Sequence, residues 1–288
     1  MSGASGFAKV TVLGAGTMGA GIAQVCAQAG SKVVLYDVEQ RFLDRGMQTI
    51  TSFLDKGVEK GKVSAADREA TLARLTVQLD LARAVAEADL VVEAVPEKLE
   101  LKRDVFGRVA RASGAATVLA TNTSSLSLER IFAGIAHPER CIGMHFFNPV
   151  PIMALLEIVQ PDTCSAATLE RVRSYATTIG KEPIVVKDSP GFATSRLGVC
   201  LGLEAIRMVE AGVASAQDID KAMELGYRHP MGPLKLTDLV GLDVRLSIAD
   251  YLRKELDSPV FEAPQLMRDM VARGQLGKKS GKGFYDWG

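Results

Sequence analysis

The spacing of glycines in TVLGAGTMGAGIAQ, residues 11–24, constrains the fold of this chain more than any other feature. Gly14, Gly16 and Gly19 fit the pattern G-x-G-x-x-G, which follows the short apolar run KVTVL and precedes an apolar stretch over residues 20–29. In a strand, turn and helix unit, the first glycine permits the tight turn and the second lets backbone N–H groups approach a ligand. The third lets helix and strand pack closely. The pattern therefore predicts that the phosphate groups of a bound ligand lie at the N-terminus of the helix.

A carboxylate at the end of the next strand indicates which dinucleotide this site binds. The run VVLYD ends in Asp37, where an acid can accept hydrogen bonds from both ribose hydroxyls of NAD but would repel the 2′-phosphate of NADP. We therefore expect NAD as the cofactor, and we expect Thr17 and Met18, between the second and third glycines, to line its site. Arg41 is the one nearby cation that would favour NADP, and we interpret it as a solvated helix residue.

Short β-branched runs alternate with helical stretches through the first two thirds of the chain. The expected strands cover residues 9–13, 32–37, 88–95, 116–122, 140–147, 155–160 and 183–188. Alternation of strands and helices is typical of a parallel sheet, and consecutive apolar residues indicate strands covered by helices on both faces. The sequence predicts an α/β protein with a Rossmann-type, doubly wound, mostly parallel sheet.

The pattern changes after Asp188, where we place a domain boundary. Residues 1–188 are expected to form the NAD-binding Rossmann domain, and residues 189–288 an all-helical substrate and dimerisation domain. Ser189 is the expected N-cap and Pro190 the first residue of a helix that runs to Gly212 and is apolar almost all round, so we expect it to be buried. Further helices are expected over residues 215–226, 234–256 and 264–274.

Composition excludes several classes of protein. Lys plus Arg and Asp plus Glu both number 34 in 288 residues, so the net charge favours neither nucleic acid nor an anionic membrane as a partner. No apolar run is long enough for a signal peptide or a membrane span, and we expect a cytoplasmic protein. The four cysteines lie far apart without a C-x-x-C pair, which predicts buried free thiols and no metal site.

The stretch MHFFNPVPIMALLEIV, residues 144–159, carries the most informative polar side chains. His145 ends an apolar strand, and the carboxyl ends of parallel strands form the cofactor crevice. Glu157 interrupts an apolar strand, where a buried carboxylate needs a cation or a strong donor. If Glu157 accepts from one ring nitrogen of His145, the other nitrogen can take a proton from an alcohol. The alternative is a core histidine and a surface carboxylate; His137 and His229 are expected to be structural.

Ser124, in TNTSSLS, is expected at the same edge of the sheet. It follows the strand that ends at Ala120, so its hydroxyl could bind a substrate oxygen. The alternative suits its neighbours Ser125 and Ser127 equally well, since any of the three could cap the helix expected near Leu128.

Motifs throughout the chain resemble the L-3-hydroxyacyl-CoA dehydrogenase family, and within it the 3-hydroxybutyryl-CoA dehydrogenases. The motifs are GAGTMGAGIA, TNTSSL, GMHFFNPVP, DSPGF, HPMGPL with TDLVGLD, and GKKSGKGFYDW. The resemblance implies that His145 is the general base and Glu157 its partner, that Ser124 and Asn148 bind the reacting oxygen, and that the helical domain forms a homodimer.

The resemblance also implies sites for the cofactor and for the acyl-CoA substrate. Glu97 and Lys102, in PEKLELK, are expected near the cofactor, and Lys56, Lys60 or Lys62, in KGVEKGKV, near the CoA phosphates. The sequence leaves open which of these lysines makes the phosphate contact.

One residue departs from the family pattern. Ser195, in PGFATSR, stands where the family has an active-site asparagine, and this leaves the range of substrates open.

The implied reaction is the reversible, NAD-dependent oxidation of a short-chain L-3-hydroxyacyl-CoA to the 3-ketoacyl-CoA, a step of fatty acid metabolism. A dehydrogenase of the 3-hydroxyisobutyrate or 6-phosphogluconate type is an alternative, but HFFNP with Glu157 argues against it. A catalytically silent NAD-binding protein, either crystallin-like or a redox sensor, is a second alternative. The set of Ser124, His145 and Glu157 argues against that one.

Overall fold

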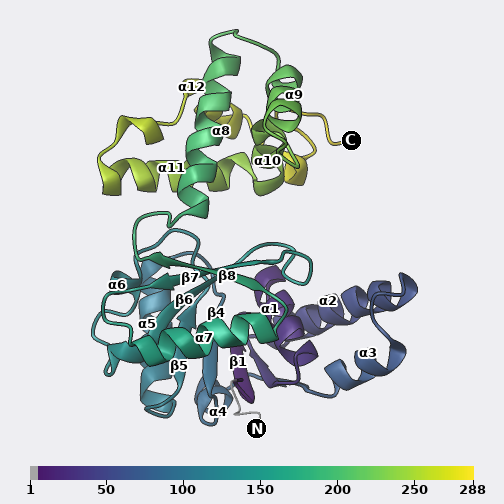
Figure 1. Ribbon diagram of the computed structural model, residues 1–288, viewed down its shortest axis with the longest axis vertical. Helices are drawn as coiled ribbons and strands as arrows, with labels where there is room; N and C mark the ends of the chain where they lie inside the picture. Colours follow the sequence, from purple (N-terminus) through teal and green to yellow (C-terminus); the bar gives the residue numbers. More distant parts are fainter. Residues whose placement is uncertain (1–5) are drawn as a thin grey trace. The chain divides into compact units, whose positions relative to one another are not determined.

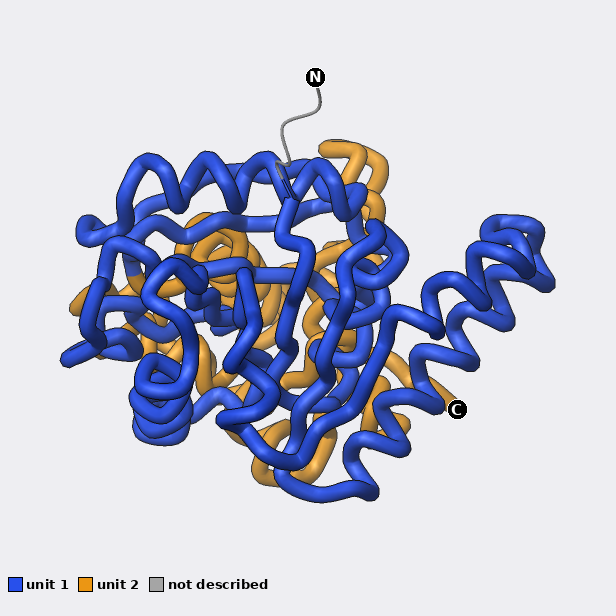
Figure 2. The backbone as a smooth tube through the Cα atoms, turned by 90° about the horizontal axis from the view of Figure 1, so that it is seen from below, with its two compact units in different colours: residues 1–189 blue, residues 190–288 orange. Residues whose placement is uncertain are grey.

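The computed structural model describes residues 6–288. The chain forms two compact units, of which the first ends at Ser189 and the second begins at Pro190 (Figure 2). Each unit has a hydrophobic core of its own.

An eight-stranded sheet forms the centre of the first unit (Figure 1). Its spatial order is β3-β2-β1-β4-β5-β6-β7-β8, and every neighbouring pair is parallel except β6 with β7. This confirms the predicted doubly wound, mostly parallel α/β sheet. The strands are β1 Lys9–Leu13, β2 Lys32–Tyr36, β3 Leu75–Gln78, β4 Leu90–Glu93, β5 Val118–Thr121, β6 Cys141–Phe146, β7 Leu155–Gln160 and β8 Glu182–Lys187.

Strand β3 is absent from the sequence-based expectation. It lies at one edge of the sheet, pairs only with β2, and buries only Leu75, so it lacks the apolar run that marks the inner strands. The missed strand extends the sheet by one edge and leaves its topological class unchanged.

Helices cover both faces of the sheet (Figure 1). Helices α1 Thr17–Gln28, α2 Gln40–Glu59 and α7 Ala166–Thr178 share one core with alternate strand residues such as Val10 and Val12. The other face is covered by α4 Leu81–Val85, α5 Leu99–Ala112 and α6 Leu128–Ile131; Thr11 donates to the Ala84 carbonyl there. Helix α3, Ala65–Leu72, packs against α1 and α2, and a 3-10 turn, Pro138–Arg140, precedes β6.

The second unit is helical through residues 190–288, all of which the structure describes, apart from two isolated β-bridges near its end. Its helices are α8 Thr194–Glu210, α9 Ala216–Gly226, α10 Pro233–Val240, α11 Leu242–Leu256 and α12 Gln265–Ala272, with 3-10 turns at Pro259–Phe261 and Lys278–Ser280. This confirms the predicted helical class of the last third of the chain.

Two expectations about these helices are wrong. Helix α8 begins at Thr194 and not at Pro190, because Gly191 and Phe192 have φ of 74° and 52°, which is left-handed backbone that no right-handed helix contains. Ser189 is therefore not its N-cap. The expected helix over residues 234–256 is two helices, separated at Gly241, whose φ is 104°.

Helix α8 is also less buried than its composition suggests. Val199, Leu203 and Ile206 lie in the core of the second unit, but Leu197 and Leu201 are exposed on the opposite side. The helix therefore has an apolar face directed into its own unit and a second apolar face that the unit leaves uncovered.

Two buried carboxylates hold the end of the chain in the second unit. Asp238, fully buried in α10, accepts hydrogen bonds from the backbone N–H groups of Phe284 and Tyr285 and from Nε1 of Trp287. Asp220 in α9 accepts the hydroxyl of Tyr285 at 2.7 Å. The Asp238 carboxylate of the motif TDLVGLD thus satisfies backbone N–H groups of the irregular segment GKGFYDW and brings the two motifs together.

We predict that Gly19→Ala destabilises the first unit, because an added Cβ would lie 1.7 Å from the Gly14 carbonyl oxygen. Overpacking of this kind costs about 1–3 kcal/mol of unfolding free energy, or more against a rigid backbone. The control is Gly107→Ala in α5, where the Cβ would meet only Arg111 Nη1 at 3.8 Å, and helix propensity should stabilise by about 0.5–1 kcal/mol. Thermal unfolding of both variants is the measurement; equal midpoints would contradict the close approach.

Candidate active site

The glycine-rich turn connects β1 to α1 at the carboxyl edge of the sheet. Gly14 has φ of 96° and donates its N–H to the Tyr36 carbonyl at 2.8 Å, and a Cβ on it would lie 2.7 Å from the Ala94 carbonyl oxygen. Gly16 is the N-cap of α1 and contributes no side chain to the first turn. The N–H groups of that turn are therefore accessible to an anionic ligand, as a bound pyrophosphate requires.

A pocket of about 610 Å³ lies at this turn. Gly14, Gly16, Thr17, Met18 and Asp37 all line it. The remaining wall is mostly apolar. It comes from the ends of β2 and β4 and from helices α2, α4 and α5, and it includes Phe42, Leu81, Ala94, Val95, Pro96, Leu101 and Val105. Gly19 lies under the turn and packs against Gly14. The residues predicted for one end of the cofactor are thus brought together in one crevice.

Asp37 serves the turn itself as well as the pocket. One carboxylate oxygen accepts the N–H of Ala15 at 2.7 Å and the other accepts the N–H of Val38 at 2.7 Å. The side chain is held beside the pocket with unused lone pairs, since each carboxylate oxygen can accept more than one hydrogen bond. The guanidinium group of Arg41 forms an ion pair with Glu39, with 2.7 Å between Nε and Oε2.

A fully buried ion pair lies at the ends of β4 and β5. Lys102 Nζ in α5 is 2.6 Å from Glu93 Oε1, and both side chains are at most 1% exposed. Glu93 also accepts the hydroxyl of Thr121 at 2.6 Å and the N–H of Val95 at 2.7 Å. Burial raises the pKa of the Glu93 carboxyl, and the Lys102 ammonium and the other donors oppose that shift.

Glu97 connects this pair to the loop that follows β5. Its carboxylate lies 3.2 Å from Lys102 Nζ, accepts a short hydrogen bond from the hydroxyl of Thr123, and accepts the N–H of Ser124 at 2.9 Å. Glu97 is partly exposed, whereas Lys102 is not. Lys102 is therefore positioned to orient Glu97, and Glu97 to orient the backbone at Ser124.

His145 and Glu157 face each other across β6 and β7. They are register partners of the antiparallel pair, and His145 Nδ1 lies 2.8 Å from Glu157 Oε2. The Glu157 side chain is fully buried and that of His145 is 6% exposed. A carboxylate at Nδ1 favours the tautomer that carries a proton there, which makes Nε2 the ring nitrogen for proton exchange with a substrate. The ring of Phe147 packs against the imidazole at 4.5 Å between centroids.

Two further candidates lie in the loops that follow β5 and β6. Asn148 is exposed in the connection between β6 and β7. Ser124 is half-buried, and it does not cap a helix: Ser127 is the N-cap of α6 and accepts the N–H of Arg130. The capping alternative for Ser124 is therefore wrong.

Four further residues predicted for the substrate lie outside these two loops. Lys56 and Lys60 are exposed at the carboxyl end of α2, where Lys60 is the C-cap, and Lys62 is exposed in the turn that follows. Ser195 is the second residue of α8 and belongs to the second unit.

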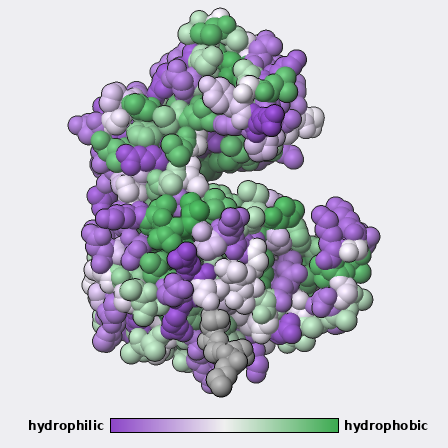
Figure 3. All heavy atoms as spheres, viewed as in Figure 1, coloured by the Kyte–Doolittle hydropathy of each residue, from purple (hydrophilic) through white to green (hydrophobic). Residues whose placement is uncertain are grey.

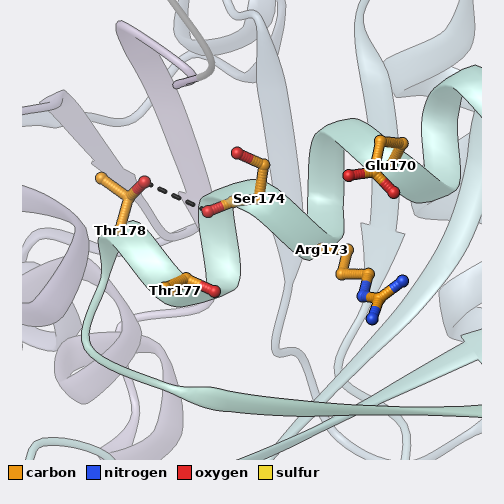
Figure 4. A pocket seen from close by; sticks show the side chains of 5 residues that line it. All are labelled: Glu170, Arg173, Ser174, Thr177 and Thr178. Atoms are coloured by element: carbon orange, nitrogen blue, oxygen red, sulfur yellow. Dashed lines mark hydrogen bonds between the residues drawn. The ribbon is translucent and has the colours of Figure 1, made fainter.

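A second pocket, of about 590 Å³, lies on the outer surface of α7 and contains no predicted site residue (Figure 4). Glu170, Arg173, Ser174, Thr177 and Thr178 line it, all from one helix, and the hydroxyl of Thr178 donates to the Ser174 carbonyl at 3.1 Å. Because all five residues come from the outer surface of one helix, we interpret this pocket as a surface groove and not as a catalytic site.

Across residues 6–288, no group of three histidine, cysteine or acidic residues is placed to hold a metal ion. In the same part of the chain, no helix is both long and apolar enough to cross a membrane. The four cysteines are free thiols, and burial raises the pKa of Cys26 and Cys141 to about 12.

Sequence reasoning missed several residues of the site. Glu93, Thr121 and Thr123 complete the network around Lys102 and Glu97. Glu93 carries the same signal that revealed Glu157, an acid within an apolar strand, in the run ADLVVEAV. The two threonines carry no such signal, because strands commonly contain threonine, as at Thr121, and Thr123 is one of several hydroxyl residues in TNTSSLS.

The fold and the geometry of the glycine-rich turn define a dinucleotide-binding protein of the Rossmann class. Residues 9–189 match the family model of the 3-hydroxyacyl-CoA dehydrogenase NAD binding domain, and residues 191–287 match that of the 3-hydroxyacyl-CoA dehydrogenase C-terminal domain. The chain belongs to the 3-hydroxyacyl-CoA dehydrogenase family, and its cofactor is NAD. The resemblance indicated by the motifs is confirmed.

Several known proteins are similar to this chain in sequence over nearly its whole length. A 3-hydroxybutyryl-CoA dehydrogenase of Mycobacterium tuberculosis is 42% identical, over 97% of this chain and 98% of its own length. The mitochondrial hydroxyacyl-coenzyme A dehydrogenase of Rattus norvegicus is 42% identical, over 96% and 90%. Among solved structures, (S)-3-hydroxybutyryl-CoA dehydrogenase PaaH1 from Ralstonia eutropha has a TM-score of 0.94 at 39% identity, covering 98% of this chain and 99% of its own.

We predict that Asp37→Asn raises the KM for NAD and improves the relative use of NADP. The amide keeps one acceptor for the Ala15 N–H but loses the charge that binds ribose hydroxyls and repels a 2′-phosphate. A change of about tenfold or more in the ratio of the two kcat/KM values corresponds to a hydrogen bond to a charged group. The control is Arg41→Ala, which should leave the ratio unchanged because Arg41 pairs with Glu39. A reversed outcome, in which only Arg41→Ala changes the ratio, would contradict this assignment.

Proposed function

We propose that this protein catalyses the reversible oxidation of a short-chain L-3-hydroxyacyl-CoA to the 3-ketoacyl-CoA, with His145 as the general acid and base. The observation that carries the proposal is the 2.8 Å contact of His145 Nδ1 with Glu157 Oε2 at the carboxyl end of β6. That contact lies in the sheet that also carries the dinucleotide turn.

In this mechanism the protein moves a proton and holds the reacting groups in place. NAD, when bound, supplies the hydride acceptor. His145 Nε2 takes the proton of the substrate hydroxyl, and the Glu157 carboxylate keeps the ring oriented and stabilises the imidazolium that results. Because the pair is almost fully buried, solvent does not compete for these hydrogen bonds.

Ser124 and Asn148 are proposed to bind the reacting oxygen. The support for Ser124 is its backbone N–H, which donates to the Glu97 carboxylate. This hydrogen bond holds the residue in a defined orientation after the end of β5. What supports Asn148 is its place in the connection that follows His145. The roles proposed for Glu97 and Lys102 use the same network: Glu97 is proposed to act near the cofactor, and its contact with Lys102 Nζ at 3.2 Å supports a role for Lys102 in orienting it.

The substrate class rests on the family and on the relatives, which include 3-hydroxybutyryl-CoA dehydrogenases. Lys56 and Lys60, exposed at the end of α2, are proposed to meet the CoA phosphates, with Lys62 as the alternative ligand. Ser195 is proposed to take the place of the usual asparagine in the substrate pocket. We also propose that the enzyme acts in fatty acid metabolism.

We place the enzyme in the cytoplasm. The support is chemical: all four cysteines are free, as in proteins of a reducing compartment. Subcellular fractionation with antibody detection tests this assignment.

The protein is proposed to be active as a homodimer through the helical unit. Apolar side chains that this unit leaves exposed include Leu197, Val213, Leu225, Tyr227 and Val244. Figure 3 shows hydrophobic residues interspersed with hydrophilic ones on the visible face of this unit. Large exposed apolar side chains are typical of an interface between subunits when they form a patch.

Light scattering at micromolar concentration is expected to give about twice the 30.7 kDa mass of the chain. The replacement Leu197→Glu should reduce the mass toward that of a single chain, because it places a charge on the uncovered face of α8. A wild-type mass of one chain would contradict the dimer.

We predict that the purified enzyme oxidises NADH with acetoacetyl-CoA as substrate, and that His145→Ala lowers kcat by about 10²–10⁴-fold, the usual loss for a general base. The matched control is His137→Ala, since His137 is exposed and pairs only with Glu139 among the contacts seen for it. The KM for NADH should stay within about twofold in both variants. A loss below tenfold for His145→Ala would contradict its role, and no activity in the wild type would contradict the proposed reaction.

A further inference from the structure

The connection between β6 and β7, residues 147–154, is held by two contacts on its inner side. Most of this segment is exposed, including Asn148, Ile152 and Met153, but Val150 is 2% exposed and lies in the core of the first unit. An exposed connection without buried contacts would be mobile, so these contacts determine where its polar residues lie.

The first contact is a buried ammonium group. Lys181 comes directly before β8 and is 7% exposed, and its Nζ donates to the carbonyl of Val150 at 2.5 Å and to that of Met153 at 2.7 Å. Its next residue, Glu182, donates its backbone N–H to the Ala154 carbonyl, so Lys181 approaches the loop from a strand already in register with it. Hydrogen bonds from a charged donor are about twice as strong as neutral ones, and they satisfy two carbonyls that lie outside the sheet.

A buried ammonium carries a cost that a hydrophobic residue at this position would avoid. Burial disfavours the charged form and lowers the pKa of Lys181. The Lys181 ammonium lies where two loop carbonyls converge. We interpret its role as holding the loop through hydrogen bonds, because a hydrophobic side chain would fill the same space without this cost.

The second contact is with the helix that follows the glycine-rich turn. A Cβ added to Gly21 in α1 would lie 2.8 Å from Val150 Cβ and 3.5 Å from Pro151 Cδ. The absence of a side chain at Gly21 thus sets how closely the loop approaches α1. Lys181 and Gly21 constrain the same stretch of loop through different atoms.

We propose that Lys181 is a positioning residue for the reaction: its ammonium group holds the loop of residues 147–154 so that Asn148 presents its amide beside His145. This inference rests on the proposed function, in which Asn148 binds the reacting oxygen. Lys181 acts only through the loop and does not touch substrate. Gly21 keeps the same loop seated against the helix of the dinucleotide site.

A double-mutant cycle on kcat/KM for acetoacetyl-CoA tests the proposal. Lys181→Met keeps an unbranched side chain that is one atom shorter and removes the donors. It should lower kcat/KM by about tenfold or more, since small displacements of a positioning group are costly. In an Asn148→Ala background the same replacement should change kcat/KM by less than about twofold, because both changes remove one function. The KM for NADH should not change. The control is Lys32→Met, an exposed lysine at the start of β2, expected to match the wild type.

Hydrogen exchange of the ligand-free enzyme gives a readout apart from activity. The N–H groups of Ile152 and Met153 donate to the Pro149 carbonyl, so peptides covering residues 147–154 should exchange faster in Lys181→Met than in Lys32→Met. If Lys181→Met does not fold, Gly21→Ala is the second variant, because its added Cβ pushes Val150 outward. It should lower kcat/KM and speed exchange over residues 147–154 in the same way. Gly107→Ala is its control.

The outcomes are distinguishable. If Asn148→Ala alone has no effect on kcat/KM, the proposed role of Asn148 fails, and the positioning role of Lys181 fails with it. If Asn148→Ala is impaired but Lys181→Met and Gly21→Ala retain wild-type kcat/KM and exchange, only the positioning role is overturned. Multiplicative losses in the cycle would mean that Lys181 acts independently of Asn148, and would also overturn it.

Discussion

Two carboxylates buried in strands, Glu93 and Glu157, impose the constraint on which the rest of the site depends. Each is fully buried, and an ionised carboxylate in such a place must be matched by donors. Glu93 is matched by Lys102, Thr121 and a backbone N–H, and Glu157 by His145. Both lie toward the carboxyl edge of the sheet, so satisfying them also fixes the polar groups around the expected reaction.

The reversed direction of β7 determines how the second pair forms. Because β7 runs antiparallel to β6, Glu157 lies directly opposite His145, and a short connection leads from one to the other. That connection contains Asn148. Lys181, directly before β8, donates a hydrogen bond to the carbonyl of Val150 in the same connection. A further parallel strand would need a long crossover, and the loop between the two residues could not then be this short. The one departure from a parallel sheet therefore builds the candidate catalytic pair.

Much of this arrangement follows from local sequence. The glycine spacing and Asp37 predict the dinucleotide turn, and an acid that interrupts an apolar strand predicts a buried partner for Glu157. The same reasoning applies to Glu93, an acid within the apolar run ADLVVEAV, but nothing in that run indicates its partner. Its partner Lys102 lies on a helix, and only the packing of α5 on the sheet brings the two together.

Other features depend on tertiary structure that no local pattern reveals. Lys181 has the sequence signature of an exposed lysine before a strand, and its burial arises from the loop that folds over it. The start of α8 is set by left-handed backbone at Phe192, a residue type that carries no signal for that conformation. Strand β3 is held by pairing with β2 rather than by its own apolar content.

The most direct test of this account is a double-mutant cycle at the central pair. His145→Ala, Glu157→Gln and the double variant are compared by kcat/KM for acetoacetyl-CoA, after thermal unfolding shows that each is folded. If Glu157 acts only through His145, the double variant should be within about twofold of His145→Ala alone. Losses that multiply would contradict the account, because they would show that Glu157 contributes to the reaction, or to the fold, without the histidine.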